Sequence, residues 1–294
     1  MHKLLFIINP IAGGGRAKNL IPLIQEKMKD NNIDYEIIHT TEPEEATDIV
    51  EKSESTIVIA VGGDGTVNEV AKGLIKRGSG VLGIIPGGTG NDMCKSLGLS
   101  MDPTHALETV IKGKTKEMDI GLANGKCFLN ISSVGFDAEV VRNTDKIKIK
   151  IPGKTAYILG VLITLIKYRK KKTDIEIDGE KFNKNMLLLA VGNGQYYGGG
   201  MRILPDAKID DGYLHLCLVK DISNLKSLFL FPSIFKGDHL KYTKYVEVYK
   251  ARNILFKTKG DFYLNIDGDL IHTKDKVEFK ISTKKLDIIY EEEI

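Results

Sequence analysis

Gly62-Gly63-Asp64-Gly65-Thr66 is a glycine-rich turn that directly follows Thr56 to Val61, a short apolar run rich in β-branched residues. Such a run predicts a buried strand. The residues after the turn predict a helix whose start is capped by Thr66, with Glu69 completing a capping box. A strand that turns through glycines into a helix directs backbone N–H groups and the positive end of the helix dipole at the turn, and this geometry suits phosphate.

The carboxylate of Asp64 would repel an anion here unless a cation lay between them, so the stretch indicates Mg²⁺ together with a nucleotide. An ordinary tight turn of an α/β domain explains the same residues, because glycine-rich turns are common. The pattern recurs where the strand Lys3 to Ile8 leads into Asn9 to Gly15, and where Val81 to Ile85 leads into Pro86 to Asp92. In a parallel sheet the three loops would meet at one edge, where such folds bind ligands.

The composition limits the number of domains, the kinds of partner and the location that the chain can have. The chain has 294 residues, about two domains' worth, and 42% of them are hydrophobic, enough for a core. Its net charge of +3 gives no indication of a nucleic-acid partner. The three cysteines are widely spaced, as expected of free thiols in a reducing cytosol. No apolar stretch reaches the roughly 18 residues that a membrane span needs, so we predict a cytoplasmic protein.

Two patterns of secondary structure follow one another along the chain. Residues 1–121 alternate strand, loop and helix, which predicts a doubly wound α/β domain; its expected helices include 17–29, 44–53 and 104–112. Residues 122–278 are dense in short strands separated by turns, which predicts an antiparallel β-sandwich. The expected strands of this second domain are 126–133, 173–177, 186–193, 213–219, 245–249, 253–257 and 262–266, and 277–290 is also extended.

Several motifs, in this order and spacing, resemble the catalytic domain of diacylglycerol kinases, and in particular the soluble bacterial lipid kinases related to sphingosine and ceramide kinases. They are Asn-Pro-x-Ala-Gly from residue 9, Gly-Gly-Asp-Gly-Thr-x-Asn-Glu from 62 and Pro-x-Gly-Thr-x-Asn-Asp from 86, followed by Gly135 to Ala138, Pro205 to Tyr213 and Asp267-Gly268-Asp269. NAD kinases share the second motif alone. The later motifs make the resemblance specific to the lipid kinases, and it covers nearly the whole chain.

The resemblance implies that ATP is the nucleotide and that residues 279–294 return to complete the α/β nucleotide-binding domain. Glycines of the 62–66 turn allow the backbone to approach phosphate closely, and Thr66 and Thr89 offer hydroxyls. The full set of implied nucleotide and Mg²⁺ contacts is Asn9, Pro10, Ile11, Ala12, Gly13, Thr41, Gly62, Gly63, Asp64, Gly65, Thr66, Val67, Asn68, Glu69, Thr89 and Asp92. Asp64 and Asp92 follow neighbouring predicted strands and could share the cation.

Catalysis needs a carboxylate to take the proton of the attacking hydroxyl. The family usually has Asp-Gly-Glu where this chain has Asp267-Gly268-Asp269, and the resemblance implies that Asp269 accepts the proton and that Asp267 also takes part. The acid at 269 is one methylene shorter than usual. In isolation, Asp-Gly is more often a hairpin turn. The resemblance further implies a structural Mg²⁺ bound by the backbone carbonyls of Lys208 and Tyr213 and the side chain of Asp211.

The function expected from these residues is an ATP- and Mg²⁺-dependent kinase that phosphorylates the primary hydroxyl of diacylglycerol to give phosphatidic acid. Three alternatives remain: a kinase for a sphingoid base, ceramide or glycolipid, an NAD kinase, and a nucleotide- or lipid-binding module that has lost catalysis. The oligomeric state, with a homodimer among the options, and the acyl preference are not determined by the sequence.

The segment 146–172 has an apolar centre, Ala156 to Ile166, between lysine-rich flanks. One interpretation is a helix resting on an anionic membrane surface, which would place the protein at the inner face of the membrane, where its lipid substrate lies. The other is a packed core helix with solvated lysines at both ends.

Overall fold

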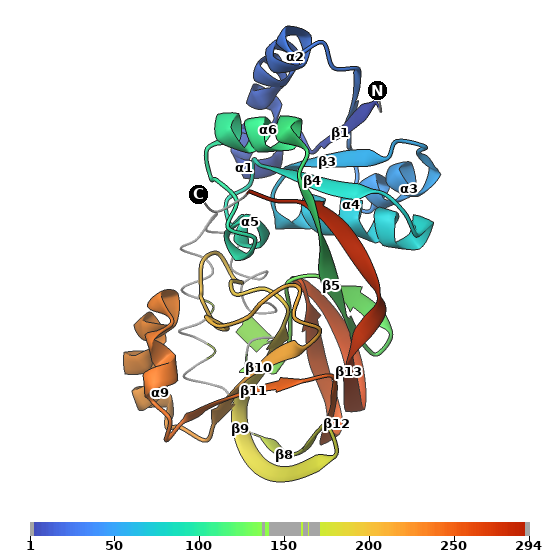
Figure 1. Ribbon diagram of the computed structural model, residues 1–294. Coiled ribbons are helices and arrows are strands. Elements are labelled where there is room, and N and C mark those ends of the chain that lie inside the picture. Colours follow the sequence, from blue (N-terminus) through green and yellow to red (C-terminus); the bar gives the residue numbers. More distant parts are fainter. Residues whose placement is uncertain (1–2, 137–138, 141–159, 161–163, 165–170, 292–294) are drawn as a thin grey trace. The chain divides into compact units, whose positions relative to one another are not determined.

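The computed structural model describes residues 3–136, 139–140, 160, 164 and 171–291 (Figure 1). Contacts within the chain divide it into two units: unit 1 comprises residues 1–118 and 284–294, and unit 2 comprises residues 119–283. The Asp137-Ala138 part of one sequence motif and nearly all of the segment 146–172 lie outside the described residues, so the membrane interpretation of that segment is untested. No helix within the described ranges is long and apolar enough to cross a membrane.

Unit 1 is built on a parallel sheet of short, buried strands. Its order is β2 (Tyr35–His39), β1 (Leu4–Ile8), β3 (Ile57–Gly62) and β4 (Val81–Pro86). The end of the long strand β13 (Asp269–Ile289) pairs in parallel with β4, with Asp287 opposite Val81. All five residues of β1 are buried, as expected for a strand covered on both faces.

Helices contribute apolar side chains to both faces of this sheet. Helices α2 (Ile21–Asp30) and α6 (Pro103–Lys112) contribute Ile24, Met28, Leu107 and Val110 to a core shared with Phe6, Ile8 and Ile59. Helices α3 (Glu45–Lys52) and α4 (Asp64–Arg77) pack against each other, so closely that a Cβ on Gly73 would lie 2.7 Å from Cβ of Val50. Shorter elements follow the strands: α1 (Ala12–Gly15), η1 (Lys18–Leu20) and α5 (Asp92–Ser96).

The predicted capping box at the start of α4 is wrong. The N-cap is Gly63, no side chain caps the helix, and Thr66 lies inside the first turn. The hydroxyl of Thr66 is instead packed under Gly62, where a Cβ would lie 2.4 Å from its oxygen. The helix therefore begins three residues earlier than a cap at Thr66 would place it, at Asp64. The helix expected at 17–29, in contrast, begins later than predicted, at Ile21, after a 3₁₀ turn.

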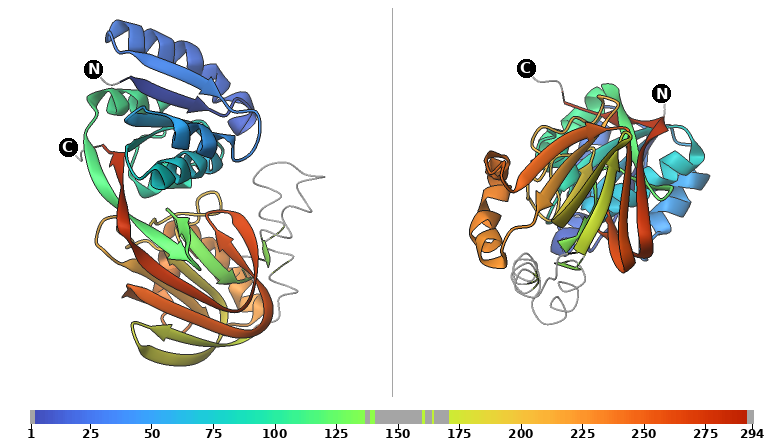
Figure 2. Two further views of the ribbon diagram at one scale, coloured as in Figure 1. Left: turned by 90° about the vertical axis from the view of Figure 1, so that its right-hand side faces the viewer. Right: turned by 90° about the horizontal axis from the view of Figure 1, so that it is seen from below.

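Unit 2 is an antiparallel β-sandwich, as predicted. Strand β9 (Glu180–Gly192) pairs with β7, β8 and β10, and β12 (Asn253–Ile266) pairs with β7, β8 and β13, as Figure 2 shows for β12 and β13. The other strands are β5 (Thr115–Ala123), β6 (Lys126–Phe128), β7 (Ile131–Gly135), β8 (Lys171–Ile177), β10 (Leu214–Lys220) and β11 (Val246–Ala251). The whole chain thus has the predicted fold class.

Several strand boundaries differ from the prediction; β9, for example, begins at Glu180 rather than at 186. The runs 253–257 and 262–266 form one strand, β12, because a bulge between Lys257 and Asp261 carries it through the polar residues between them. Strand β13 begins at Asp269 rather than at 277. The run 126–133 is broken into β6 and β7 at Leu129-Asn130, whose N–H groups bind a side chain instead of another strand.

The central strands of unit 2 are covered on both faces. Leu189 and Val191 of β9 face the interior of the sandwich, whereas the alternating Leu188 and Ala190 face a second core. Over that second face lie α9 (Asn224–Leu230), η2 (Phe231–Lys236) and η3 (Asp238–Lys241), the orange helical segment of Figure 1. The loop Gly198-Gly199-Gly200 has positive φ at all three residues.

Candidate functional site

Three glycine-rich loops meet where β1, β3 and β4 end. The N–H of Gly87 donates to the carbonyl oxygen of Gly62 at 2.8 Å. A Cβ on Gly88 would lie 2.3 Å from Cα of Gly63, and one on Gly13 would lie 2.2 Å from the carbonyl oxygen of Gly87. Only glycine allows backbones to approach this closely. The predicted convergence of the loops at one edge of the sheet is confirmed.

Arg16 ties the first loop to the third. Its Nε donates to the carbonyl oxygen of Gly13 at 3.0 Å, and its Nη2 donates to the carbonyl oxygen of Gly88 at 2.8 Å and to the Thr89 hydroxyl at 3.4 Å. The guanidinium thus places a positive charge at the edge where the loops meet. The sequence interpretation missed Arg16, although a basic residue directly after three glycines was an available signal.

Asn91 closes the third loop and was also missed. It is buried, its φ is +50°, and its Oδ1 accepts the N–H of Gly88 at 3.0 Å while its Nδ2 donates to the Gly88 carbonyl at 3.2 Å. Asparagine tolerates this left-handed conformation better than most residues. The loop is therefore held in shape before any ligand arrives.

Asp64 and Asp92 begin the two helices that follow β3 and β4. Asp92 is only 4% exposed, and Lys95 donates to its Oδ1 at 2.9 Å. Oδ1 of Asp64 accepts the N–H of Met93 at 2.9 Å. Burial raises the pKa of Asp64 above its ordinary value, and the negative charge of Asp92 raises it further. Two neighbouring carboxylates that repel each other, one buried and one partly buried, fit a shared cation.

The first turn of α4 offers backbone donors. A helix leaves its first N–H groups without partners inside the helix, and here those groups belong to the residues that follow Gly63. Gly65 is exposed, and a Cβ built on it would meet nothing within 4 Å. Neither φ nor packing requires a glycine at this position. A ligand that approaches the backbone here would explain why the side chain is absent.

The other predicted nucleotide contacts lie on the loop after β1 and, in the case of Thr41, after β2. Oδ1 of Asn9 accepts the N–H of Ile11 at 3.2 Å, and the Ile11 side chain is 80% exposed. Thr41 follows β2, and both its N–H and its hydroxyl donate to Oε2 of Glu45, at 2.6 and 3.1 Å. These bonds lower the pKa of Glu45. The roles of Asn9, Pro10, Ile11, Ala12 and Thr41 stay predictions.

In unit 2, Asp267-Gly268-Asp269 forms the hairpin between β12 and β13. Asp267 has φ +49°, and its carboxylate accepts three backbone N–H groups, from Leu129 at 2.7 Å, Asn130 at 3.0 Å and Ile131 at 2.9 Å. Asp269, at the start of β13, is exposed. The turn therefore combines a carboxylate anchored to a neighbouring segment with a second one that faces solvent.

In the turn 208–213, the carboxylate of Asp211 is paired with a lysine ammonium. Lys250 Nζ lies 2.8 Å and His215 Nε2 lies 3.1 Å from Oδ2 of Asp211, while Oδ1 accepts the N–H of Tyr213 at 3.2 Å. These partners, with the nearby positive charge, lower the pKa of Asp211 although partial burial raises it. The ammonium of Lys250 thus lies on the carboxylate of Asp211, as that of Lys95 lies on Asp92, and a divalent cation at either carboxylate would share it with the lysine. The predicted cation stays a prediction, and no step below passes through it.

The same turn is held by a residue that the sequence patterns did not single out. Asp119 is 2% exposed, and its Oδ2 accepts the N–H of Gly212 at 2.7 Å. Its own N–H donates to the carbonyl oxygen of Ile209 at 2.7 Å. Asp119, on β5, therefore anchors a turn that lies about 90 residues further along the chain. Local sequence patterns do not reveal a contact between residues so far apart.

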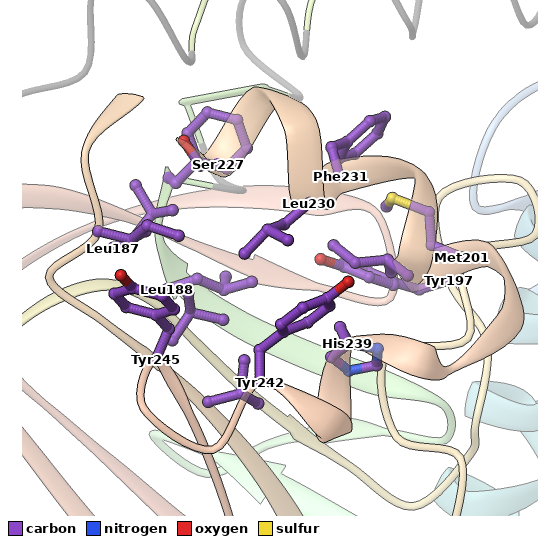
Figure 3. A pocket seen from close by; sticks show the side chains of 15 residues that line it. Leu187, Leu188, Tyr197, Met201, Ser227, Leu230, Phe231, His239, Tyr242 and Tyr245 are labelled. Carbon is purple, nitrogen blue, oxygen red and sulfur yellow. The ribbon is translucent and has the colours of Figure 1, made fainter. Parts of the chain in front are cut away.

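An apolar pocket lies in unit 2 between the outer face of β9 and β10 and the segment α9–η3 (Figure 3). Its cavity is about 70 Å³. Figure 3 shows side chains from both sides pointing into it, among them Leu187, Leu188, Tyr197, Met201, Leu230, Phe231, Tyr242 and Tyr245. His239 adds a polar edge: Nε2 lies 3.0 Å from the carbonyl oxygen of Ile203, and within the described part of the chain Nδ1 has no hydrogen-bond partner.

Comparison with known proteins assigns the family. Residues 3–123 match the diacylglycerol kinase catalytic domain, and residues 130–289 match the YegS C-terminal NAD kinase beta sandwich-like domain. A diacylglycerol kinase of Staphylococcus epidermidis is 31% identical over 90% of this chain and 84% of its own length. The chain belongs to the diacylglycerol kinase family. The present chain, a lipid kinase, is also 30% identical to a diacylglycerol kinase of Bacillus subtilis, over 92% of this chain and 90% of that protein.

Solved structures show the same fold for the kinase. A crystal structure of a diacylglycerol kinase from Bacillus anthracis is 27% identical, with a TM-score of 0.74 over 99% of this chain and 97% of that one. An NAD kinase from Archaeoglobus fulgidus in complex with ATP is 13% identical, with a TM-score of 0.55 over 99% and 94%. The second likeness concerns the fold alone.

Proposed function

We propose that this kinase transfers the γ-phosphoryl group of ATP, with Mg²⁺, to the primary hydroxyl of diacylglycerol and so produces phosphatidic acid. The relatives named diacylglycerol kinase support the choice of acceptor. The observation that carries the proposal is the apolar pocket of unit 2, in a chain whose unit 1 gathers three glycine loops and two neighbouring carboxylates at one edge of a sheet. Apolar walls suit acyl chains and do not suit a polar acceptor such as NAD.

Unit 1 would hold the nucleotide. The N–H groups at the start of α4 and the guanidinium of Arg16 supply positive charge for phosphate oxygens. Asp64 and Asp92 would hold Mg²⁺, which when bound would neutralise charge on the phosphates. Because Asn91 and Arg16 already fix the third loop, little ordering of the backbone would be needed on binding.

Unit 2 would supply the base. In the proposed step, Asp269 accepts the proton of the primary hydroxyl as the hydroxyl oxygen forms its bond to the γ-phosphorus. The bond between that phosphorus and the bridging oxygen breaks, and ADP leaves with the electron pair. Asp267 is a positioning residue in this proposal, because three backbone N–H groups hold its carboxylate two residues away from Asp269.

Replacing Gly65 by alanine tests the approach of the nucleotide. In α4 the change removes a flexible residue and meets no neighbour within 4 Å, so the free energy of unfolding should rise by about 0.5–1 kcal/mol. If phosphate approaches the backbone here, affinity for ATP should nevertheless fall severalfold. Urea unfolding and calorimetric titration with ATP measure the two effects. Gly125→Ala, in the β5–β6 turn, is the control for nucleotide affinity, and unchanged ATP binding by Gly65→Ala would contradict the placement.

Replacing Asp267 by asparagine tests the positioning role. Asparagine tolerates the positive φ but lacks the charge that attracts three N–H donors, so we expect a loss of about 2 kcal/mol of unfolding free energy and a lower rate of transfer. Asp178→Asn is the matched control. Asp178 also has positive φ before a glycine, and it accepts the N–H groups of Arg252 and Asn253. That variant should lose stability and keep its rate; equal effects of the two variants on rate would contradict the assignment.

The proposed function is tested by offering dioleoylglycerol in mixed micelles, a sphingoid base and NAD in parallel, with γ-labelled ATP and Mg²⁺. Label in phosphatidic acid is the expected result. Label in the sphingoid base alone would keep a lipid kinase and change its acceptor, and label in NAD alone would overturn the lipid assignment. Binding of ATP without transfer to any acceptor would indicate a module that has lost catalysis.

A further inference from the structure

Helix α9 presents large apolar side chains to solvent. Leu225 is 66% exposed and Phe229 is 76% exposed, and because they are four residues apart they lie on one face of the helix. Phe235 of the adjoining η2 is 40% exposed. Exposed leucine and phenylalanine side chains gathered in one place are unusual on a monomer and commonly mark an interaction surface.

The opposite face of the same segment covers the apolar pocket. Ser227 and Leu230 of α9 and Phe231 of η2 line that pocket, whereas Leu225 and Phe229 do not (Figure 3). One short segment therefore separates the pocket from the exposed apolar side chains. Whatever covers Leu225 and Phe229 lies close to the molecules that enter the pocket.

The charge around the segment selects the partner. Residues 220–245 contain five lysines and two aspartates, and two of the lysines, Lys220 and Lys241, form ion pairs with Glu247 and Asp238. Lys226 of α9 and Lys244 both lie over the ring of Tyr245, 5.8 and 5.7 Å from its centre, and both side chains are exposed. Apolar side chains flanked by lysines match the interface of a bilayer that contains anionic lipids.

We propose that the surface formed by Leu225, Phe229, Phe235 and the neighbouring lysines docks on an anionic membrane, with the apolar side chains inserted among the acyl chains. This inference rests on the proposed function, because a kinase for diacylglycerol must meet a substrate that resides in the bilayer. The docking site is distinct from the segment 146–172 considered in the sequence. It places the pocket next to the membrane, with α9 and η2 between them.

Tryptophan fluorescence tests insertion directly, because the chain has no tryptophan of its own. Phe229→Trp should show a blue shift of its emission on addition of phosphatidylcholine vesicles containing phosphatidylglycerol, and bromine-labelled acyl chains should quench it. Val248→Trp is the matched control, since Val248 is 51% exposed in the same unit but lies on β11. If the two variants respond alike, the proposal is overturned.

Introducing a negative charge at position 229 tests whether docking controls vesicle binding and activity. Phe229→Glu should lower partitioning into the anionic vesicles about tenfold or more, because it replaces an inserted ring by a carboxylate, whereas Val248→Glu should leave partitioning unchanged. Added salt should weaken the binding of the unmodified protein. With long-chain diacylglycerol in vesicles, Phe229→Glu should lose most of its rate, and with soluble dioctanoylglycerol it should keep it.

The outcomes separate this inference from the proposed function. Normal vesicle binding by Phe229→Glu, with transfer to diacylglycerol intact, would overturn the docking surface and leave the function standing. Vesicle binding that depends on Phe229, without transfer to any lipid, would overturn the function and leave the docking surface standing. If Phe229 instead mediates self-association, measured by sedimentation velocity without lipid, the surface is a protein interface and the membrane proposal fails.

Discussion

Asp64→Asn is expected to reduce phosphoryl transfer about a thousandfold while raising the melting temperature of the ligand-free protein. The rate should fall because asparagine lacks the charge that a cation shared with Asp92 would need. The stability should rise because the carboxylate of Asp64 is partly buried beside another negative charge, whereas the neutral amide removes that repulsion and keeps an oxygen for the N–H of Met93.

The pH dependence has a definite sign. The pKa of Asp64 is raised in the folded state. At pH values near and above the ordinary pKa of an aspartate, the folded protein therefore keeps more of the Asp64 carboxyl protonated than the unfolded chain does. The contribution of this group to stability is therefore largest at low pH and falls as the pH rises toward the raised pKa. Asp64→Asn should remove that part of the pH dependence, and the melting temperature of both proteins from pH 4 to 8 measures it.

Asp48→Asn, an exposed acid on α3, is the control for the charge change and should alter neither property. Steady-state transfer to dioleoylglycerol and thermal melting without ligands provide both readouts. Unchanged transfer by Asp64→Asn would remove Asp64 from the nucleotide and metal site. A lower melting temperature would mean that the hydrogen bond from Met93 outweighs the cost of burial and repulsion.

Asp269→Asn should lower kcat by about two to three orders of magnitude with little change in affinity for ATP, because the amide cannot accept the proton of the attacking hydroxyl. Asp269→Glu restores the acid that the family usually has and should keep much of the activity, since the carboxylate can still accept the proton and gains one methylene of reach. Initial rates and calorimetric titration with ATP separate the catalytic from the binding effect.

Asp261→Asn is the matched control for Asp269→Asn. Asp261 is an exposed acid on β12, the strand that leads into the same hairpin. It should keep the wild-type rate. If Asp269→Asn is as active as the unmodified kinase, the proton acceptor lies elsewhere, and Asp267 becomes the next residue to test.

Local patterns predicted the parts of the fold that depend on local residues. The buried strands and the glycine turns of unit 1 were recognisable because strand burial and left-handed or crowded backbone both restrict residue type strongly. The predicted cap at Thr66 failed because packing beneath Gly62 uses the threonine differently. Two runs merged into β12 because a bulge, which has no clear sequence signal, carries the strand through the polar residues between them.

The fold class, the three glycine-rich loops and the pair of acids at 64 and 92 could be predicted from the residues alone, because each of these follows from residues close together in the chain. The contacts between distant residues became visible in the folded protein. It showed that Asp267 binds N–H groups more than 130 positions away, that Arg16 joins two loops, and that α9 has one face on a pocket and another in solvent. Hydrogen bonds and packing between remote segments depend on distance in space, which local periodicity and spacing do not encode.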